Sequence, residues 1–304
     1  GKEVARQCHT VGVQVNFAPV ADVDNNPQNP VINFRSFGSD PKRVADKVVS
    51  YTRGLEEGGV LAVCKHFPGH GDTEIDSHKA LPELSFDRSR LDSIELYPFR
   101  KAIEAGIGGV MVGHLHAPVL GEEPASISQQ VIMHTLIEEL RFQGLVVTDA
   151  LEMKGIAGHD DVCALALMAG NDMLLAPRNL KKEIDGVMTA LKKGTLSKEE
   201  IDRKCRKVLT FKYALGLSDW HDVAEDGIEE KLQTPELSEL QQELAKAAVT
   251  VLKDSSALLP LDLSVSGTVL LSVSSSLSEA YPFYNQLHQG FPLSWIHADA
   301  DSLE

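Results

Sequence analysis

Five short runs of almost entirely apolar, often β-branched residues recur along the chain and are separated by segments with a helical pattern. Runs of this kind predict strands that are buried on both faces of a parallel sheet. Strand alternating with helix is the pattern of βαβ units. The predicted strands cover residues 13–20, 60–66, 108–114, 144–150 and 171–177.

Three of the intervening segments carry start signals for helices. Asp40 and Pro41 precede apolar residues at helical spacing, and proline suits the first helical turn. Ser197 and Glu200 are spaced as in a capping box. Ser128 precedes a segment with apolar positions Val131, Ile132, Leu136 and Leu140. We therefore predict helices that begin after residues 40, 128 and 197.

The predicted fold class is α/β, and two architectures fit the alternation: an open doubly wound sheet and a (β/α)8 TIM-type barrel. Several strand runs end in polar, often ionisable residues, among them Asp22, Lys65, His114 and Asp149. A barrel gathers such residues at one mouth. No GxGxxG or Walker loop follows a strand, which disfavours a nucleotide-binding open sheet. We predict the barrel, N-terminally incomplete in this chain because five strands cannot close it.

The composition changes after residue 217. We assign 1–217 to the incomplete (β/α)8 catalytic barrel and the acidic stretch 218–240 to a linker that leads into a helix. Residues 241–304 read as the start of a second α/β sandwich domain. We expect both ends of the sequence to be cut within a longer protein. The compartment therefore stays open between bacterial periplasmic or exported and cytoplasmic.

Charge and apolar patterning narrow the partners. The formal net charge of −15 argues against a nucleic-acid partner, because nucleic acids select clustered Lys and Arg. No run approaches the roughly 18–20 apolar residues of a membrane-spanning segment. The four cysteines form no CxxC pair, so zinc-site and redox patterns are absent. We predict no cofactor.

The stretch from Lys65 to Leu84, KHFPGHGDTEIDSHKALPEL, concentrates groups that can move protons or hold a polar ligand. It follows a predicted strand. Asp76 and His78 stand two residues apart, which in an extended segment puts them on the same side. A carboxylate beside an imidazole holds its tautomer and raises its basicity. We read this loop as part of a site, the alternative being a solvated polar loop.

Three further candidates come with strong structural alternatives. Asp149 ends a strand run, where an aspartate is also a common helix N-cap. Arg35 lies in a long polar excursion and could grip hydroxyls, or it could be an ordinary surface residue. His114 and His116 end another strand, where an HxH pair can bind metal in barrel hydrolases. His114 could equally be a hydrogen-bonded residue in the barrel mouth. A metal-dependent TIM-barrel hydrolase is therefore a rival interpretation, although no HExxH spacing is present.

Taken together, these motifs resemble glycoside hydrolase family 3, in particular its β-N-acetylglucosaminidases (β-hexosaminidases). The loop matches the pattern K-H-F-P-G-H-G-D-T-x-x-D-S-H. The other matching segments, in the same order as in the family, are NFAPVADVDNNPQNPVI, RSFG with a following DP, VMVGH and VVTDALEMKGI. The likeness runs from about residue 1 to 217, and AKAAVTVLKDSSALLPL resembles the entry to the second domain of longer members.

The resemblance implies a role for each matching residue. The catalytic nucleophile falls on Asp149, and the general acid/base falls on His78 with Asp76 as its dyad partner. The sugar-gripping arginine falls on Arg35, and the family's Lys-His pair falls on two residues at the end of the second strand run, Lys65 and His66. We group His114 with these predicted substrate-binding residues, and we expect no metal.

The implied reaction is retaining hydrolysis of terminal N-acetyl-β-D-glucosaminides, from peptidoglycan fragments or chitooligosaccharides, through a covalent glycosyl-enzyme. We expect the loop that carries His78 to be mobile and to close over the substrate. Two alternatives stay open besides the metal hydrolase. Phosphate in place of water would make the protein an N-acetylglucosaminide phosphorylase, and a chain without catalysis would be a sugar-binding fragment.

Overall fold

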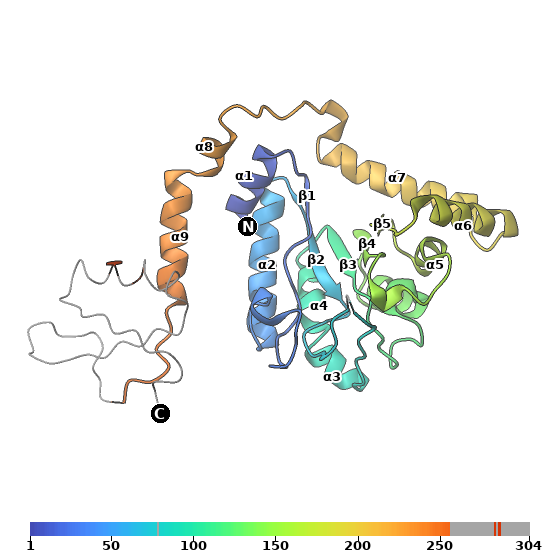
Figure 1. Cartoon of the computed structure of the whole chain (residues 1–304), viewed down its shortest axis with the longest axis horizontal. Helices are drawn as coiled ribbons and strands as arrows, with labels where there is room; N and C mark the ends of the chain where they lie inside the picture. The colour runs from blue at the N-terminus through green and yellow to red at the C-terminus, as the bar shows by residue number, and fades with distance from the viewer. Residues whose placement is uncertain (78, 256–282, 284, 287–304) are drawn as a thin grey trace, which may run out of the picture. The chain divides into compact units, whose positions relative to one another are not determined.

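The computed structural model describes residues 1–77, 79–255, 283 and 285–286 (Figure 1). The chain divides into two compact units, 1–243 and 244–304, and the fold described below is that of the first. The strands predicted for the second domain lie outside the described residues. In the described part, no helix combines the length and the apolar character needed to cross a membrane.

A five-stranded parallel sheet forms the centre of the first unit. Its strands pair in the order in which they follow along the chain, without the reversal of an open doubly wound sheet. This is the arrangement of a curled sheet that makes up part of a barrel. The strands are β1 (Val15–Asn16), β2 (Leu61–Phe67), β3 (Gly109–Val112), β4 (Leu145–Ala150) and β5 (Met173–Leu175).

The first strand is much shorter than the predicted run 13–20, so that boundary was wrong. Pro19 has no N–H to give to a ladder. Its carbonyl oxygen still accepts a hydrogen bond from Lys65 N at 3.1 Å, and an isolated parallel bridge joins Val20 to Lys65. The chain after β1 therefore continues alongside β2 in an interrupted form, and it carries Asp22 to the carboxyl end of β2.

Helices fill the segments between the strands, and two predicted caps are confirmed. The Asp40 side chain accepts from Arg43 N at 2.8 Å, and Ser197 Oγ accepts from Glu200 N at 3.0 Å. The helices are α1 (Lys2–Thr10), α2 (Pro41–Glu57), α3 (Arg88–Ser93), α4 (Tyr97–Glu104), α5 (Val162–Ala169), α6 (Leu180–Lys193), α7 (Lys198–Ala214), α8 (Ile228–Leu232) and α9 (Pro235–Ala248).

The segment after Ser128 differs from the expected α-helix. Residues Gln130–Glu139 form a π-helix, and its wider turn brings Leu140 N within 3.0 Å of Thr135 O, five residues earlier. The apolar positions predicted to face the core, Val131, Ile132, Leu136 and Leu140, are buried. The prediction thus identified the buried face correctly and the helix type wrongly.

The sheet is apolar on both faces, as the uniform strand runs predict. One face packs with α2 and α4, where Val44, Val48 and Phe99 are fully buried. The opposite face forms a second cluster that includes Val63, Met111 and Val147, and side chains of α7 pack against it. Each fully buried aliphatic or aromatic side chain contributes about 1.5–3 kcal/mol, so this core fixes the strand ends that carry the polar groups.

Candidate active site

Polar side chains gather at the carboxyl ends of the parallel strands. Asp22 follows β1, Lys65 and His66 lie near the end of β2, and Asp149 lies near the end of β4. His114 follows β3. Because parallel strands end at the same edge of a sheet, the topology brings these residues to one region of the molecule.

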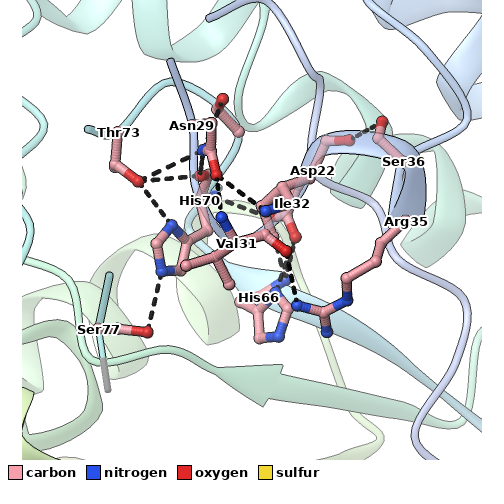
Figure 2. A network of polar contacts seen from close by, with 11 residues as sticks. Asp22, Asn29, Val31, Ile32, Arg35, Ser36, His66, His70, Thr73 and Ser77 are labelled. Atoms are coloured by element: carbon pink, nitrogen blue, oxygen red, sulfur yellow. Dashed lines mark hydrogen bonds and ion pairs between the residues drawn. The ribbon is translucent and has the colours of Figure 1, made fainter. Parts of the chain in front are cut away.

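Asp22 is the centre of this region, and the sequence reading did not assign it a role. Its carboxylate is fully buried and accepts hydrogen bonds from His66 N, from His66 Nδ1 at 2.7 Å and from His70 N at 2.7 Å (Figure 2). Burial alone would raise the pKa of Asp22, but the nearby His66 and His70 outweigh burial and lower it. The ionised carboxylate accepts from Nδ1–H and so directs the Nε2 lone pair of His66 away from itself.

Lys65 is half-buried, and its charge environment connects the predicted site residues. Burial lowers the pKa of Lys65, and the positive charge of Arg35 lowers it further. The carboxylates of Asp149 and Asp22 act in the opposite direction. Arg35 and Asp149 therefore both lie near enough to Lys65 for their charges to act on it. All three residues were singled out in the sequence. Asp149 itself is half-buried, and its Oδ1 accepts from Ala150 N at 2.8 Å.

Arg35 is held on the excursion between β1 and α2. It ends a short 3-10 helix, Asn33–Arg35, and its guanidinium donates to Val31 O at 3.1 Å. Buried Asn29 shapes this excursion, because its Oδ1 accepts from Val31 N and Ile32 N at 2.9 and 2.8 Å.

Asn29 also joins the Arg35 excursion to the loop after β2. Its Nδ2 donates to His70 O at 2.7 Å and to Gly71 O at 2.9 Å (Figure 2). The sequence gave no signal for this role, since a single asparagine in a polar loop is common. The two loops that carry Arg35 and Asp76 therefore share one buried hydrogen-bonding residue.

The loop after β2 reaches across to the loop after β4. Ser77 is buried, and its carbonyl oxygen accepts from Gly155 N at 3.1 Å. Asp76 is half-buried, with its Oδ2 3.9 Å from Lys79 Nζ, and its carbonyl accepts from Lys79 N and Ala80 N. His78, the predicted acid/base, lies outside the described residues. Ser77, the residue before it, is nevertheless hydrogen-bonded to the segment that follows Asp149.

His114 is fully buried at the end of β3. Its Nε2 lies 3.0 Å from Ala150 O and its Nδ1 lies 2.7 Å from Ser126 Oγ. A carbonyl only accepts, so Nε2 carries the proton and Nδ1 accepts from the serine hydroxyl. Both ring nitrogens of His114 are therefore bonded to protein atoms. The Nε2 bond attaches His114 to Ala150, the last residue of β4.

The histidines at this edge do not form a metal-ligand cluster within the described ranges. No three His, Cys, Asp or Glu side chains there are arranged to hold a metal ion. The ring nitrogens of His70 face Thr73 and Ser77, and those of His114 face Ser126 and Ala150. In the described part of the chain, the ring nitrogens of these two histidines are therefore occupied by protein partners.

Comparison with known proteins identifies the same segment as the sequence motifs do. The family model described as glycosyl hydrolase family 3 N terminal domain matches residues 1–211. β-Hexosaminidase A of Pseudoalteromonas piscicida is 34% identical over 280 residues, which cover 84% of this chain and 46% of that protein. The chain spans about half the length of such curated relatives.

Solved structures of the same family are also similar to this chain. A glycoside hydrolase family 3 β-N-acetylglucosaminidase from Paenibacillus sp. str. FPU-7 is 37% identical with a TM-score of 0.73, over 81% of this chain and 50% of that one. A β-glucoside phosphorylase, BglX, superposes with a TM-score of 0.81 at 26% identity, over 99% of this chain and 60% of that one. The match is therefore to proteins of one fold that are named for different activities.

Proposed function

Because this chain belongs to glycosyl hydrolase family 3, as the sequence motifs predicted, we propose that the intact protein hydrolyses terminal N-acetyl-β-D-glucosaminides with retention of configuration. The proposal includes a complete (β/α)8 barrel, to which the curled sheet of this chain contributes five strands. The names of similar proteins, a β-hexosaminidase and a β-N-acetylglucosaminidase, support this choice of sugar.

One observation carries the mechanism: the hydrogen bond between Gly155 N and Ser77 O. It joins the loop that contains Asp76 and His78 to the segment that follows Asp149. A retaining glycosidase needs a nucleophile on one side of the anomeric carbon and a proton donor near the leaving oxygen. This contact supports placing the two groups at the same strand end.

In the first step the Asp149 carboxylate attacks the anomeric carbon, and His78, paired with Asp76, gives its proton to the departing glycosidic oxygen. In the second step His78 takes a proton from water, the water oxygen bonds to the anomeric carbon, and the sugar–Asp149 ester bond breaks. Lys65 and Arg35 place positive charge near the proposed nucleophile.

The remaining site residues bind the sugar or hold other parts of the site in position. Arg35, Lys65 and His66 are proposed to hydrogen-bond the sugar, with His66 oriented by Asp22. We assign His114 to holding the end of β4 rather than to sugar contact, since it is fully buried with both ring nitrogens in use. No metal or cofactor enters this mechanism.

The test uses the intact protein and aryl N-acetyl-β-glucosaminides. Asp149→Ala should abolish turnover, whereas Asp185→Ala, an exposed aspartate on α6, should leave it unchanged. His78→Ala should slow substrates with poor leaving groups by about 10²–10⁴-fold and activated aryl substrates far less. Near wild-type turnover in both site variants would refute the assignment.

A phosphorylase is the second candidate, and the likeness to β-glucoside phosphorylase BglX favours it. Once His78 has given up its proton, its neutral imidazole adds no negative charge that would repel phosphate, so phosphate could replace water in the second step. Product analysis with and without phosphate separates the two. Free N-acetylglucosamine in both conditions supports hydrolysis, and a sugar 1-phosphate formed only with phosphate supports the phosphorylase.

A further inference from the structure

A buried chain of hydrogen bonds runs from Asp22 to Ser77, through His70. Asp22 Oδ1 accepts from His70 N at 2.7 Å, His70 Nδ1 lies 2.7 Å from Thr73 Oγ1, and His70 Nε2 lies 3.0 Å from Ser77 Oγ (Figure 2). His70, Thr73 and Ser77 are all buried, with exposed fractions of 1%, 3% and 2%. The proposed mechanism gives none of these three residues a task.

The proton positions in this chain follow from the donors and acceptors. Thr73 has a single hydroxyl proton, and its Oγ1 donates that proton to His70 O at 3.2 Å. His70 Nδ1 must then carry a proton and donate to Thr73 Oγ1. The other nitrogen, Nε2, is left as an acceptor for the Ser77 hydroxyl. Burial lowers the pKa of His70, which agrees with a neutral ring.

Ser77 is held from two sides. Its hydroxyl bonds to His70, which is fixed to β2 through Asp22, and its carbonyl oxygen bonds to Gly155 N in the loop after β4. In the sequence Ser77 stands between Asp76 and His78. Fixing the Ser77 backbone constrains the direction in which Asp76 leaves it.

We propose that His70, as a neutral imidazole protonated at Nδ1, is a positioning residue that latches Ser77 and thereby orients the adjacent Asp76–His78 pair. The role rests on the proposed glycosidase function. His70 is not catalytic, because it bonds to the protein and not to the substrate. Its effect should be confined to the steps in which the acid/base moves a proton.

Two variants remove the same bond from opposite ends. Ser77→Ala deletes the hydroxyl. In His70→Asn the shorter amide can still donate to Thr73 but cannot reach Ser77. Each should lower kcat/KM, which reports the first step alone, by about 10–100-fold for N-acetyl-β-glucosaminides with poor leaving groups, as expected for a misplaced acid, and by at most about 3-fold for activated aryl substrates. The double variant should lose no more than either single one.

The control is Ser93→Ala, an exposed serine on α3 bonded to Arg90 O, which should match the wild type on every substrate. Equal slowing of activated and poor substrates by Ser77→Ala and His70→Asn would overturn the latch, because general damage to the site does not distinguish leaving groups. Additive losses in the double variant would overturn it as well. A wild-type protein that releases no sugar refutes the proposed function instead.

A measurement without substrate tests the latch independently. Long-range ¹H–¹⁵N correlation spectra of the intact protein at pH 7 should show the His70 ring neutral, with the proton on Nδ1. Ser77→Ala should shift the Nε2 resonance and leave Nδ1 protonated. A proton on Nε2, or an Nε2 resonance that does not change in Ser77→Ala, would refute the latch even if both variants showed the expected rate pattern.

Discussion

At the residue scale, Asp22 shows how one buried carboxylate organises several functional groups. It accepts from two backbone N–H groups and one ring N–H, which belong to His66 and His70. Charge-assisted bonds of this kind are about twice as strong as neutral ones, and their acceptor is expensive to remove. The carboxylate therefore orders both the predicted sugar-binding His66 and the latch residue His70.

Asp22→Ala should reduce the free energy of unfolding by about 3–5 kcal/mol, because three buried N–H groups lose their acceptor. Urea denaturation at pH 7 measures the loss. Asp46→Ala, at an exposed position of α2, is the matched control and should change stability by less than about 0.5 kcal/mol.

The loss should depend on pH in a defined direction. The pKa of Asp22 is lowered in the folded protein, so its contribution is present above the unfolded value of about 3.9 and disappears as pH falls through the folded value. The gap between wild type and Asp22→Ala should narrow below about pH 4. A gap independent of pH would show that the side chain acts through packing rather than charge.

At the element scale, the loops after β2 and β4 fit each other closely at one glycine. A Cβ built on Gly155 would lie 3.0 Å from Ser77 O and 3.3 Å from both Ala80 O and His114 Cβ. A side chain at this position would therefore require the neighbouring atoms to move by a few tenths of an ångström. Gly158, three residues later in the same loop, has open space around the corresponding position.

Gly155→Ala should therefore lower kcat on poor leaving groups by about 10-fold or more, because it displaces the segment that leads to His78. Gly158→Ala should leave the rate near wild type. The measurement is kcat over a series of aryl leaving groups with the intact protein. If the two alanine variants behaved alike, the close contact between the loops would have no bearing on catalysis.

The sequence predicted the elements well and their details less well. Five strands, the caps at Asp40 and Ser197, and the buried face of the segment after Ser128 follow from local patterns, since burial and capping are written in neighbouring residues. The π-turns at 130–139 bury the apolar positions that an α-helix was expected to bury, so the apolar pattern did not reveal the helix type. The extent of β1 depends on pairing with the distant strand β2. The same holds for Asn29 and Asp22, whose partners stand some 40 residues away in the sequence.

At the scale of the whole unit, α7 is bonded to the residues that immediately precede the last strand, β5. Asp172, just before β5, is buried and accepts from Val146 N of β4 at 3.0 Å and from Lys207 Nζ of α7 at 2.6 Å. The neighbouring Lys204 Nζ donates to Asn171 O at 2.9 Å, and burial lowers the pKa of Lys204. Two lysines thus hold α7 to the amino end of β5, opposite the edge that carries the site.

Lys207→Met keeps most of the side-chain volume and removes the charge that faces Asp172. We expect a loss of about 2–4 kcal/mol in the free energy of unfolding, slightly less than for a fully buried pair, because Val146 N still bonds to the carboxylate. Lys212→Met, at an exposed position of the same helix, is the control. Because the contact lies at the opposite end of β5 from the site, kcat at low temperature should stay near wild type while urea resistance falls. A parallel drop in kcat at temperatures where Lys207→Met remains folded would mean that α7 also shapes the active edge.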